Sequence, residues 1–143
     1  MELLKVAGIT FSYSGNPVLE NISLSVPSGQ IVSLLGPNGS GKTTLLKVLL
    51  GILRPQSGQV LVQGRPIAQM SPKELAGRMA YVPQTHRISF AYRVLDIVLM
   101  GRTPHKPFFS DYSKEDVALA LQSLERLSIL HLKDRCYNEI SGG

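Results

Sequence analysis

The feature that most constrains the fold is a glycine-rich segment that begins at Gly36 and ends at Thr43. Its spacing, G-x-x-x-x-G-K-[ST], is that of a phosphate-binding loop. An almost continuous apolar run, 31–35, precedes it, and leucines at helical spacing follow it. Such a run is typical of a strand buried on both faces, and the leucines form the apolar stripe of a helix. The sequence therefore predicts an α/β fold in which a buried strand leads into the loop and a helix begins at about Lys42.

The residue types in this loop suit a polyphosphate ligand. Three glycines let the backbone turn tightly, and successive N–H groups can then form an anion-binding concavity. The helix that follows adds the positive end of its dipole. Lys42 would place its charge beside the β- and γ-phosphates, and the Thr43 hydroxyl would ligate Mg²⁺. We therefore expect binding of a nucleoside triphosphate, and the flanking strand and helix disfavour a glycine-rich turn with a chance lysine.

The rest of the chain predicts short strands and helices. Strands are expected at 3–10, with 11–13 as a candidate extension, and at 22–26, 59–62 and 79–82. Turns are expected at 14–17, 27–29 and 64–66. Ser71 has the spelling of a helix N-cap, with Glu74 completing a capping box. Further helices are expected over 94–100 and from Ser113 on, separated by a loop at 103–112.

Composition excludes several classes of protein. The 143 residues carry a net charge of +5, but lysine and arginine are scattered singly, so we expect no nucleic-acid partner. The single cysteine, Cys136, cannot form an intramolecular disulfide. The longest nearly apolar stretch, 45–53, is too short to cross a membrane, and no secretory signal is visible at the start.

With three further segments, the loop makes the sequence resemble the nucleotide-binding subunit of ATP-binding cassette (ABC) transporters. Tyr13 lies 42 − 13 = 29 residues before Lys42, Tyr-Val-Pro-Gln ends at Gln84, and the chain closes on Ile-Ser-Gly-Gly at 140–143. The resemblance implies a P-loop NTPase core, with a mixed or parallel sheet and flanking helices, an antiparallel β edge and an α-helical subdomain. Residues 1–84 would be a RecA-like core portion with the β subdomain. Residues 85–143 would be the helical subdomain, ending in a partial signature motif.

The resemblance also implies roles for individual residues. Tyr13 would stack on adenine, although packing within a strand is an alternative. Gln84 would reach Mg²⁺ and the attacking water, and Ser141 would face the γ-phosphate held by a second subunit. Lys42 and Gln84 are the expected catalytic residues, and Thr43 and Gln84 the expected metal ligands. The full set expected to bind ATP is Tyr13, Gly36, Pro37, Asn38, Gly39, Ser40, Gly41, Lys42, Thr43, Thr44, Ser141, Gly142 and Gly143.

The family assembles in a defined way, and the resemblance extends those expectations to this chain. Two copies would form a homodimer that sandwiches two ATP molecules. Separate integral membrane permease subunits would form the pore, a periplasmic binding protein would deliver the substrate, and the chain would lie peripherally on the cytoplasmic face of the bacterial inner membrane. The helix at 94–100 and the residues 101–105 after it are most similar to importers for iron-siderophore, haem and cobalamin. Importers for manganese, zinc and molybdate are similar here as well.

The family's hydrolytic centre does not stand out in these residues. In the family, that centre has an aspartate at the end of an apolar strand, a glutamate next to it and a later histidine. Asp96 follows a leucine but lies in a helical pattern, and none of His86, His105 and His131 follows an Asp-Glu pair. We therefore expect these residues to be the N-terminal part of a longer subunit. The full-length subunit would be an ATPase, and the 143 residues alone would have negligible ATPase activity. A soluble ABC ATPase outside transport, or a module that binds nucleotide without hydrolysis, remains an alternative. A GTPase is disfavoured because the guanine-reading Asn-Lys-x-Asp is absent.

Overall fold

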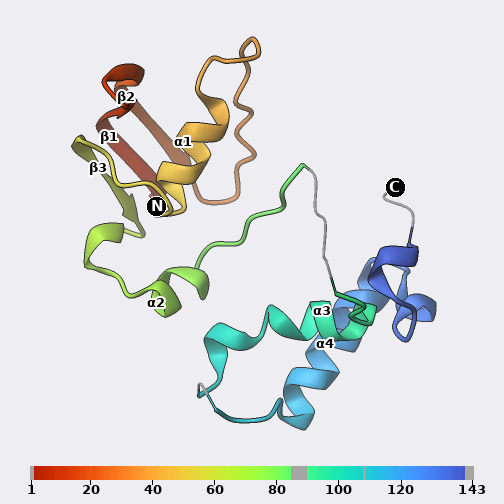
Figure 1. Cartoon of the computed structure of the whole chain (residues 1–143). Coiled ribbons are helices and arrows are strands. Elements are labelled where there is room, and N and C mark those ends of the chain that lie inside the picture. The colour runs from red at the N-terminus through yellow and green to blue at the C-terminus, as the bar shows by residue number, and fades with distance from the viewer. Residues whose placement is uncertain (1, 85–89, 108, 141–143) are drawn as a thin grey trace. The chain divides into compact units, whose positions relative to one another are not determined.

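A computed structural model describes residues 2–84, 90–107 and 109–140 (Figure 1). The chain divides into two compact units, one up to Tyr81 and the other from Val82 on. Each unit is described by itself below. Assigning the first to a nucleotide-binding core and the second to a helical subdomain stays a prediction.

The first unit is built on an antiparallel sheet with the strand order β2-β1-β3-β4. The strands are β1 (Glu2–Tyr13), β2 (Asn16–Pro27), β3 (Ser57–Val62) and β4 (Arg65–Pro66). A tight turn at Ser14 and Gly15 joins β1 to β2, and both residues have a positive φ. The strands expected at 3–10 and 22–26 are thereby confirmed, and the turn expected at 14–17 lies at its first two residues, because β2 already begins at Asn16.

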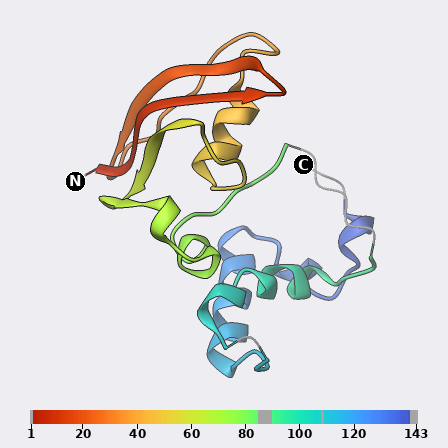
Figure 2. The same cartoon turned by 60° about the vertical axis from the view of Figure 1, so that its left-hand side comes forward.

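One face of this sheet is covered by the helix α1 (Lys42–Leu49) (Figures 1 and 2). Its buried side chains meet those of the strands in one apolar cluster: Val6, Ile9, Phe11, Leu19, Leu45, Val48, Leu49 and Val60. The helix begins at Lys42 as predicted, and Gly51, with φ +70°, follows its end. Removal of this apolar surface from water is what holds α1 to the sheet.

Two expected strands are wrong. The segments 31–35 and 79–82 have no regular secondary structure, and Ile31, Leu35 and Val82 are 98%, 89% and 90% exposed. A central parallel strand needs hydrogen-bonding neighbours and cover on both faces. The strands that the structure describes pair only with one another, and all of those pairs are antiparallel. The parallel or mixed core sheet is therefore not seen in the described residues, whereas the antiparallel part is.

A short helix, α2 (Pro72–Ala76), completes the first unit. Its capping box is formed as predicted: Glu74 N donates to Ser71 Oγ at 3.2 Å, and Ser71 N donates to Glu74 Oε2 at 2.8 Å. These bonds to Ser71 are the main reason that the pKa of Glu74 is lowered. An ion pair between Arg65 and Glu74, at 3.5 Å, joins α2 to β4.

The second unit is helical. It contains α3 (Val94–Met100), α4 (Lys114–Arg126) and 3₁₀ turns at Thr103–His105, Leu130–Leu132 and Tyr137–Glu139. The buried residues of α3 and α4 are Val94, Leu99, Asp116, Ala120 and Leu124. Asp96 lies inside α3 and binds Arg93, which confirms its interpretation as a helical residue rather than the end of a strand.

A partly buried ion pair ties the end of α3 to the start of α4. Arg102 Nε donates to Asp116 Oδ1 at 2.8 Å. The other carboxylate oxygen accepts from Ser113 N at 3.0 Å and from Ser113 Oγ at 2.9 Å. The hydrogen bond from Arg102 is the largest of the causes that lower the pKa of Asp116 from 3.8 to about 2.

This lowered pKa predicts a pH dependence of the second unit. A carboxyl group whose pKa is lowered by folding stabilises the fold above its ordinary pKa, and that contribution is lost as the pH falls through the folded value. The window set by Asp116 runs from pH 3.8 down to about 2. We expect Asp116→Asn to lower the melting temperature at pH 7, with the difference from wild type shrinking across this window. Circular dichroism melts at a series of pH values measure it.

The matched control is Asp111→Asn, which changes an exposed carboxylate close to the start of the same helix. It should leave both the melting temperature at pH 7 and the shape of the acid transition nearly unchanged. Equal acid sensitivity in wild type and Asp116→Asn would contradict the assigned role of this ion pair.

Candidate nucleotide-binding site

The glycine-rich loop leads directly into α1, and two of its glycines have left-handed backbone conformations. Gly39 and Gly41 both have φ +84°. Gly41 is the N-cap of α1, and its carbonyl oxygen accepts the first helical hydrogen bond, from Leu45 N at 2.8 Å. Since residues with a Cβ rarely adopt this conformation, the glycines are required by the backbone itself.

Gly41 is also in close contact with β2. A Cβ built on Gly41 would lie 3.0 Å from Val18 O and 3.1 Å from Leu19 Cδ2. The N-terminus of α1 is therefore packed so closely on β2 that a Cβ at this position would require Val18 or Leu19 to shift by a few tenths of an ångström. The sequence predicted that the loop glycines let the backbone turn tightly around an anion. It did not reveal that Gly41 also packs against Val18 and Leu19.

The side chain of Lys42 folds back over this loop. Its Nζ donates to Gly36 O at 2.8 Å and to Pro37 O at 2.7 Å, and lies 3.4 Å from Ser40 Oγ. The first N–H groups of a helix have no partner within it, and the helix dipole is positive at that end. Fixed charge, backbone donors and a positive helix end thus meet at residues 36–43, which suits the phosphate chain of a nucleotide.

The two threonines after Lys42 differ in exposure. Thr43 is exposed in the first turn of α1, whereas Thr44 is only 9% exposed. A hydroxyl in the position of Thr43 is suited to Mg²⁺, which keeps most of its coordination for water and phosphate oxygens. No cluster of three histidine, cysteine or acidic side chains that could hold a metal occurs among the described residues. Binding of Mg²⁺ through the Thr43 hydroxyl stays a prediction.

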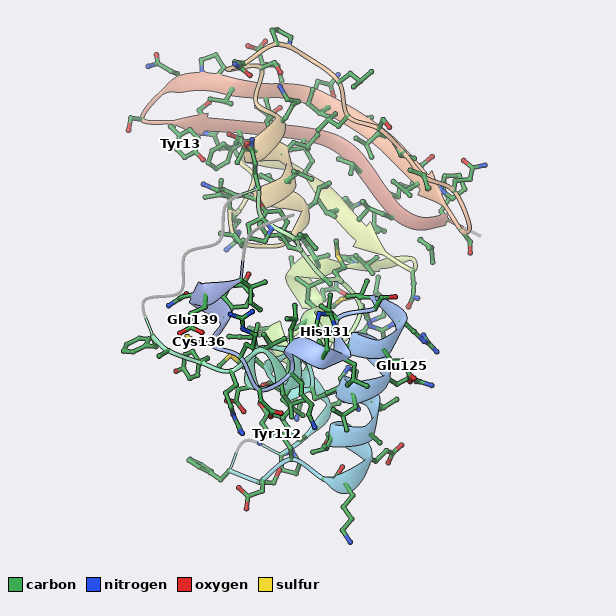
Figure 3. The ribbon with its side chains drawn as sticks, turned by 90° about the vertical axis from the view of Figure 1, so that its right-hand side faces the viewer. Tyr13, Tyr112, Glu125, His131, Cys136 and Glu139 are labelled. Atoms are coloured by element: carbon green, nitrogen blue, oxygen red, sulfur yellow. The ribbon has the colours of Figure 1, made fainter. Side chains whose placement is uncertain are left out.

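Tyr13 lies at the end of the sheet where α1 begins. The residue is 46% exposed, and its ring meets Phe11 edge to face, with 4.8 Å between the centroids. Phe11 is opposite Leu19, the residue whose side chain borders Gly41. Figure 3 shows Tyr13 on the side of β1 on which α1 lies. The structure thus brings the expected base-stacking ring and the phosphate loop to one region, and leaves part of that ring open to a ligand.

The remaining expected site residues belong to the second unit or lie outside the described residues. Gln84 is exposed and belongs to the second unit, so its contact with Mg²⁺ stays a prediction. Ser141, Gly142 and Gly143 lie outside the described residues, as does His86.

Comparison with known proteins identifies the family. A model of the family described as ABC transporter matches residues 19–143. The chain belongs to the ABC transporter family. The resemblance inferred from the phosphate loop and its companion motifs is therefore confirmed.

The most similar relatives of this ABC chain include two iron-related transport proteins. A Helicobacter pylori protein named "Probable iron chelatin transport ATP-binding protein" is 42% identical over 99% of this chain and 56% of its own length. The hemin import ATP-binding protein HmuV of Pseudomonas putida is 40% identical over 99% of this chain and 54% of its own. The chain thus spans about half the length of the curated relatives it matches.

A solved structure supports the ABC fold directly. A nucleotide-free ATP-binding cassette from an ABC transporter superposes with a TM-score of 0.84 at 31% identity, over 99% of this chain and 60% of that one. Within the part of this ABC chain that is described, no helix has the length and apolar character needed to cross a bilayer.

The contact between Gly41 and β2 predicts unequal costs for two alanine substitutions. Gly39→Ala and Gly41→Ala each carry a backbone strain of about 1–2 kcal/mol, because both glycines have φ +84°. A Cβ at Gly39 would meet nothing within 4 Å, whereas one at Gly41 would press on Val18 and Leu19. Overpacking of this kind costs about 1–3 kcal/mol more. We therefore expect Gly41→Ala to be the less stable variant in chemical denaturation, and equal stabilities would refute the contact.

Proposed function

We propose that this chain forms the MgATP-binding part of an ABC transport ATPase. The observation that carries the proposal is the geometry of the loop at 36–43. Lys42 Nζ folds back over the loop, and Gly41 packs the N-terminus of α1 against β2. Membership of the ABC family and the exposed ring of Tyr13 beside this loop support it.

Each residue of the site has a defined task in this proposal. Lys42 exchanges the carbonyl oxygens of Gly36 and Pro37 for phosphate oxygens, which accept more strongly because they are charged. The backbone N–H groups at the start of α1 donate to the same phosphates. Thr43 holds Mg²⁺, which supplies charge neutralisation when bound. Tyr13 stacks on the adenine ring, and a second copy of the subunit, through Ser141 and the glycines after it, closes over the nucleotide.

The transport role is proposed from the relatives. The names of the two curated relatives specify iron chelatin transport and hemin import. We propose import of an iron chelate or a similar substrate, with hydrolysis of ATP by the full-length homodimer. Integral membrane permease subunits would form the pore, a periplasmic binding protein would deliver the substrate, and Gln84 would couple the nucleotide to the permease from the cytoplasmic face of the inner membrane.

The first test of this function is Lys42→Ala in the full-length protein. A hydrogen bond that involves a charged group contributes about 1.5–3 kcal/mol. The variant should therefore bind MgATP roughly 10- to 150-fold more weakly in titration calorimetry. Lys47→Ala is the matched control, because it removes the same charge from the exposed last turn of the same helix. Equal losses in the two variants would show that Lys42 acts only through net charge.

The second test concerns Tyr13. Stacking of a base on an aromatic ring is worth about 1–3 kcal/mol, so Tyr13→Ala should weaken ATP binding roughly 5- to 150-fold. Tyr13→Phe keeps the ring and should bind ATP nearly as well as wild type. If both variants bind with wild-type affinity in the same calorimetric experiment, Tyr13 is only a packing residue of β1.

A further inference from the structure

A β-bulge in β1 decides which face of the sheet carries Tyr13. Between the pairs Val6–Leu24 and Ile9–Ile22, β1 has two residues where β2 has one. Against β3, between the pairs Ala7–Gln59 and Thr10–Ser57, β1 again has two residues where β3 has one. The chain of β1 is thus one residue longer than both of its neighbours at Gly8.

One inserted residue moves every later side chain of a strand to the other face. The burial of β1 shows this change. Val6, Ile9 and Phe11 are all buried, at 2%, 0% and 8% exposure. Val6 and Ile9 are three residues apart, whereas Ile9 and Phe11 have the usual strand spacing of two. Tyr13 continues the second series and contacts Phe11. In an unbulged strand, Phe11 and Tyr13 would lie on the face opposite Val6, away from α1 and the phosphate loop.

Three residues hold this bulge in place. Gly8 has φ +61°, and its N–H donates to Ser23 Oγ at 2.9 Å, so the side chain opposite the bulge satisfies a donor that the ladder leaves unpaired. Gly58 has φ +81°, and a Cβ there would lie 2.3 Å from Gly8 O and 2.5 Å from Ala7 O. Both obstacles are backbone atoms, so no side-chain rotation could relieve the clash. The bulge therefore requires glycine at position 58.

We propose that this bulge is the device that presents Tyr13 to the nucleotide, and that Gly58 and Ser23 are positioning residues for adenine binding. The proposal rests on the nucleotide-binding function proposed above. It adds residues that lie on the strands beside β1, outside the phosphate loop, and act only through the ring at Tyr13. Figure 2 shows β1 and β2 arching together along the length that contains the bulge.

The test compares two ligands in the full-length protein: MgATP and magnesium tripolyphosphate, which offers the phosphates without the base. Ser23→Ala removes the acceptor for Gly8 N–H and should lower ATP affinity about two- to fivefold, since a neutral hydrogen bond is a modest contribution. Tripolyphosphate affinity should not change. Ser25→Ala is the matched control, an exposed serine on the same strand that lies opposite Lys5; it should alter neither affinity.

Gly58→Ala should produce a larger loss of the preference for ATP over tripolyphosphate, approaching that of Tyr13→Ala. Gly64→Ala controls for backbone strain, because Gly64 has φ +79° and nothing within 4 Å of the added Cβ. When Tyr13→Ala is combined with Ser23→Ala or Gly58→Ala, the preference should fall no further, because the three substitutions act on one contact. Should Gly58→Ala fail to fold, Ser23→Ala and its double variant decide the question.

The outcomes separate the two proposals. If Tyr13→Ala lowers the preference for ATP while Ser23→Ala and Gly58→Ala leave it intact, or lower both affinities equally, the bulge has no positioning role. If Tyr13→Ala itself leaves the preference unchanged, base stacking fails, and the positioning role falls with it. If wild type binds neither ligand, the phosphate loop itself is misassigned and both proposals are overturned.

Discussion

The close contact between Gly41 and the backbone of β2 is the constraint on which the rest of the site depends. It fixes where α1 begins, and hence where its positive end and Lys42 lie. The same stretch of β2, through Leu19, faces Phe11 and so lies beside the ring of Tyr13. One packing contact between a helix N-terminus and a strand therefore relates the elements proposed to bind the phosphates and the base to each other.

An irregularity in the sheet, the bulge in β1, also helps to determine the geometry of the site. A regular β1 would bury Val6 but turn the aromatic residues after it to the opposite face. The bulge at Gly8 returns these aromatic residues to the face that carries Val6. It requires glycine with positive φ at two positions on adjacent strands. Ile9, which follows Gly8, and Val60, which lies two residues after Gly58, are members of the buried cluster, and their burial helps to offset this local strain.

Much of this could be predicted from the sequence, because the decisive signals are local. The turn between β1 and β2, the start of α1, the capping box at Ser71 and the helical state of Asp96 all follow from residues within a few positions of one another. The strands expected at 31–35 and 79–82 were wrong, because a central strand depends on distant neighbours that a local pattern cannot supply. The bulge was not predicted, although the spacing of the apolar residues signals it: three residues from Val6 to Ile9, then two from Ile9 to Phe11.

The segment from Ile31 to Leu35 has a consequence for handling this polypeptide. It combines β-branched and aliphatic side chains with a backbone outside any ladder, and its end residues are almost fully in contact with solvent. Stretches of this type readily recruit identical stretches from other molecules into intermolecular sheets. Self-association of the 143-residue polypeptide at high concentration would therefore begin here, immediately upstream of the phosphate loop, and a charged residue introduced at Leu35 would be the simplest way to suppress it.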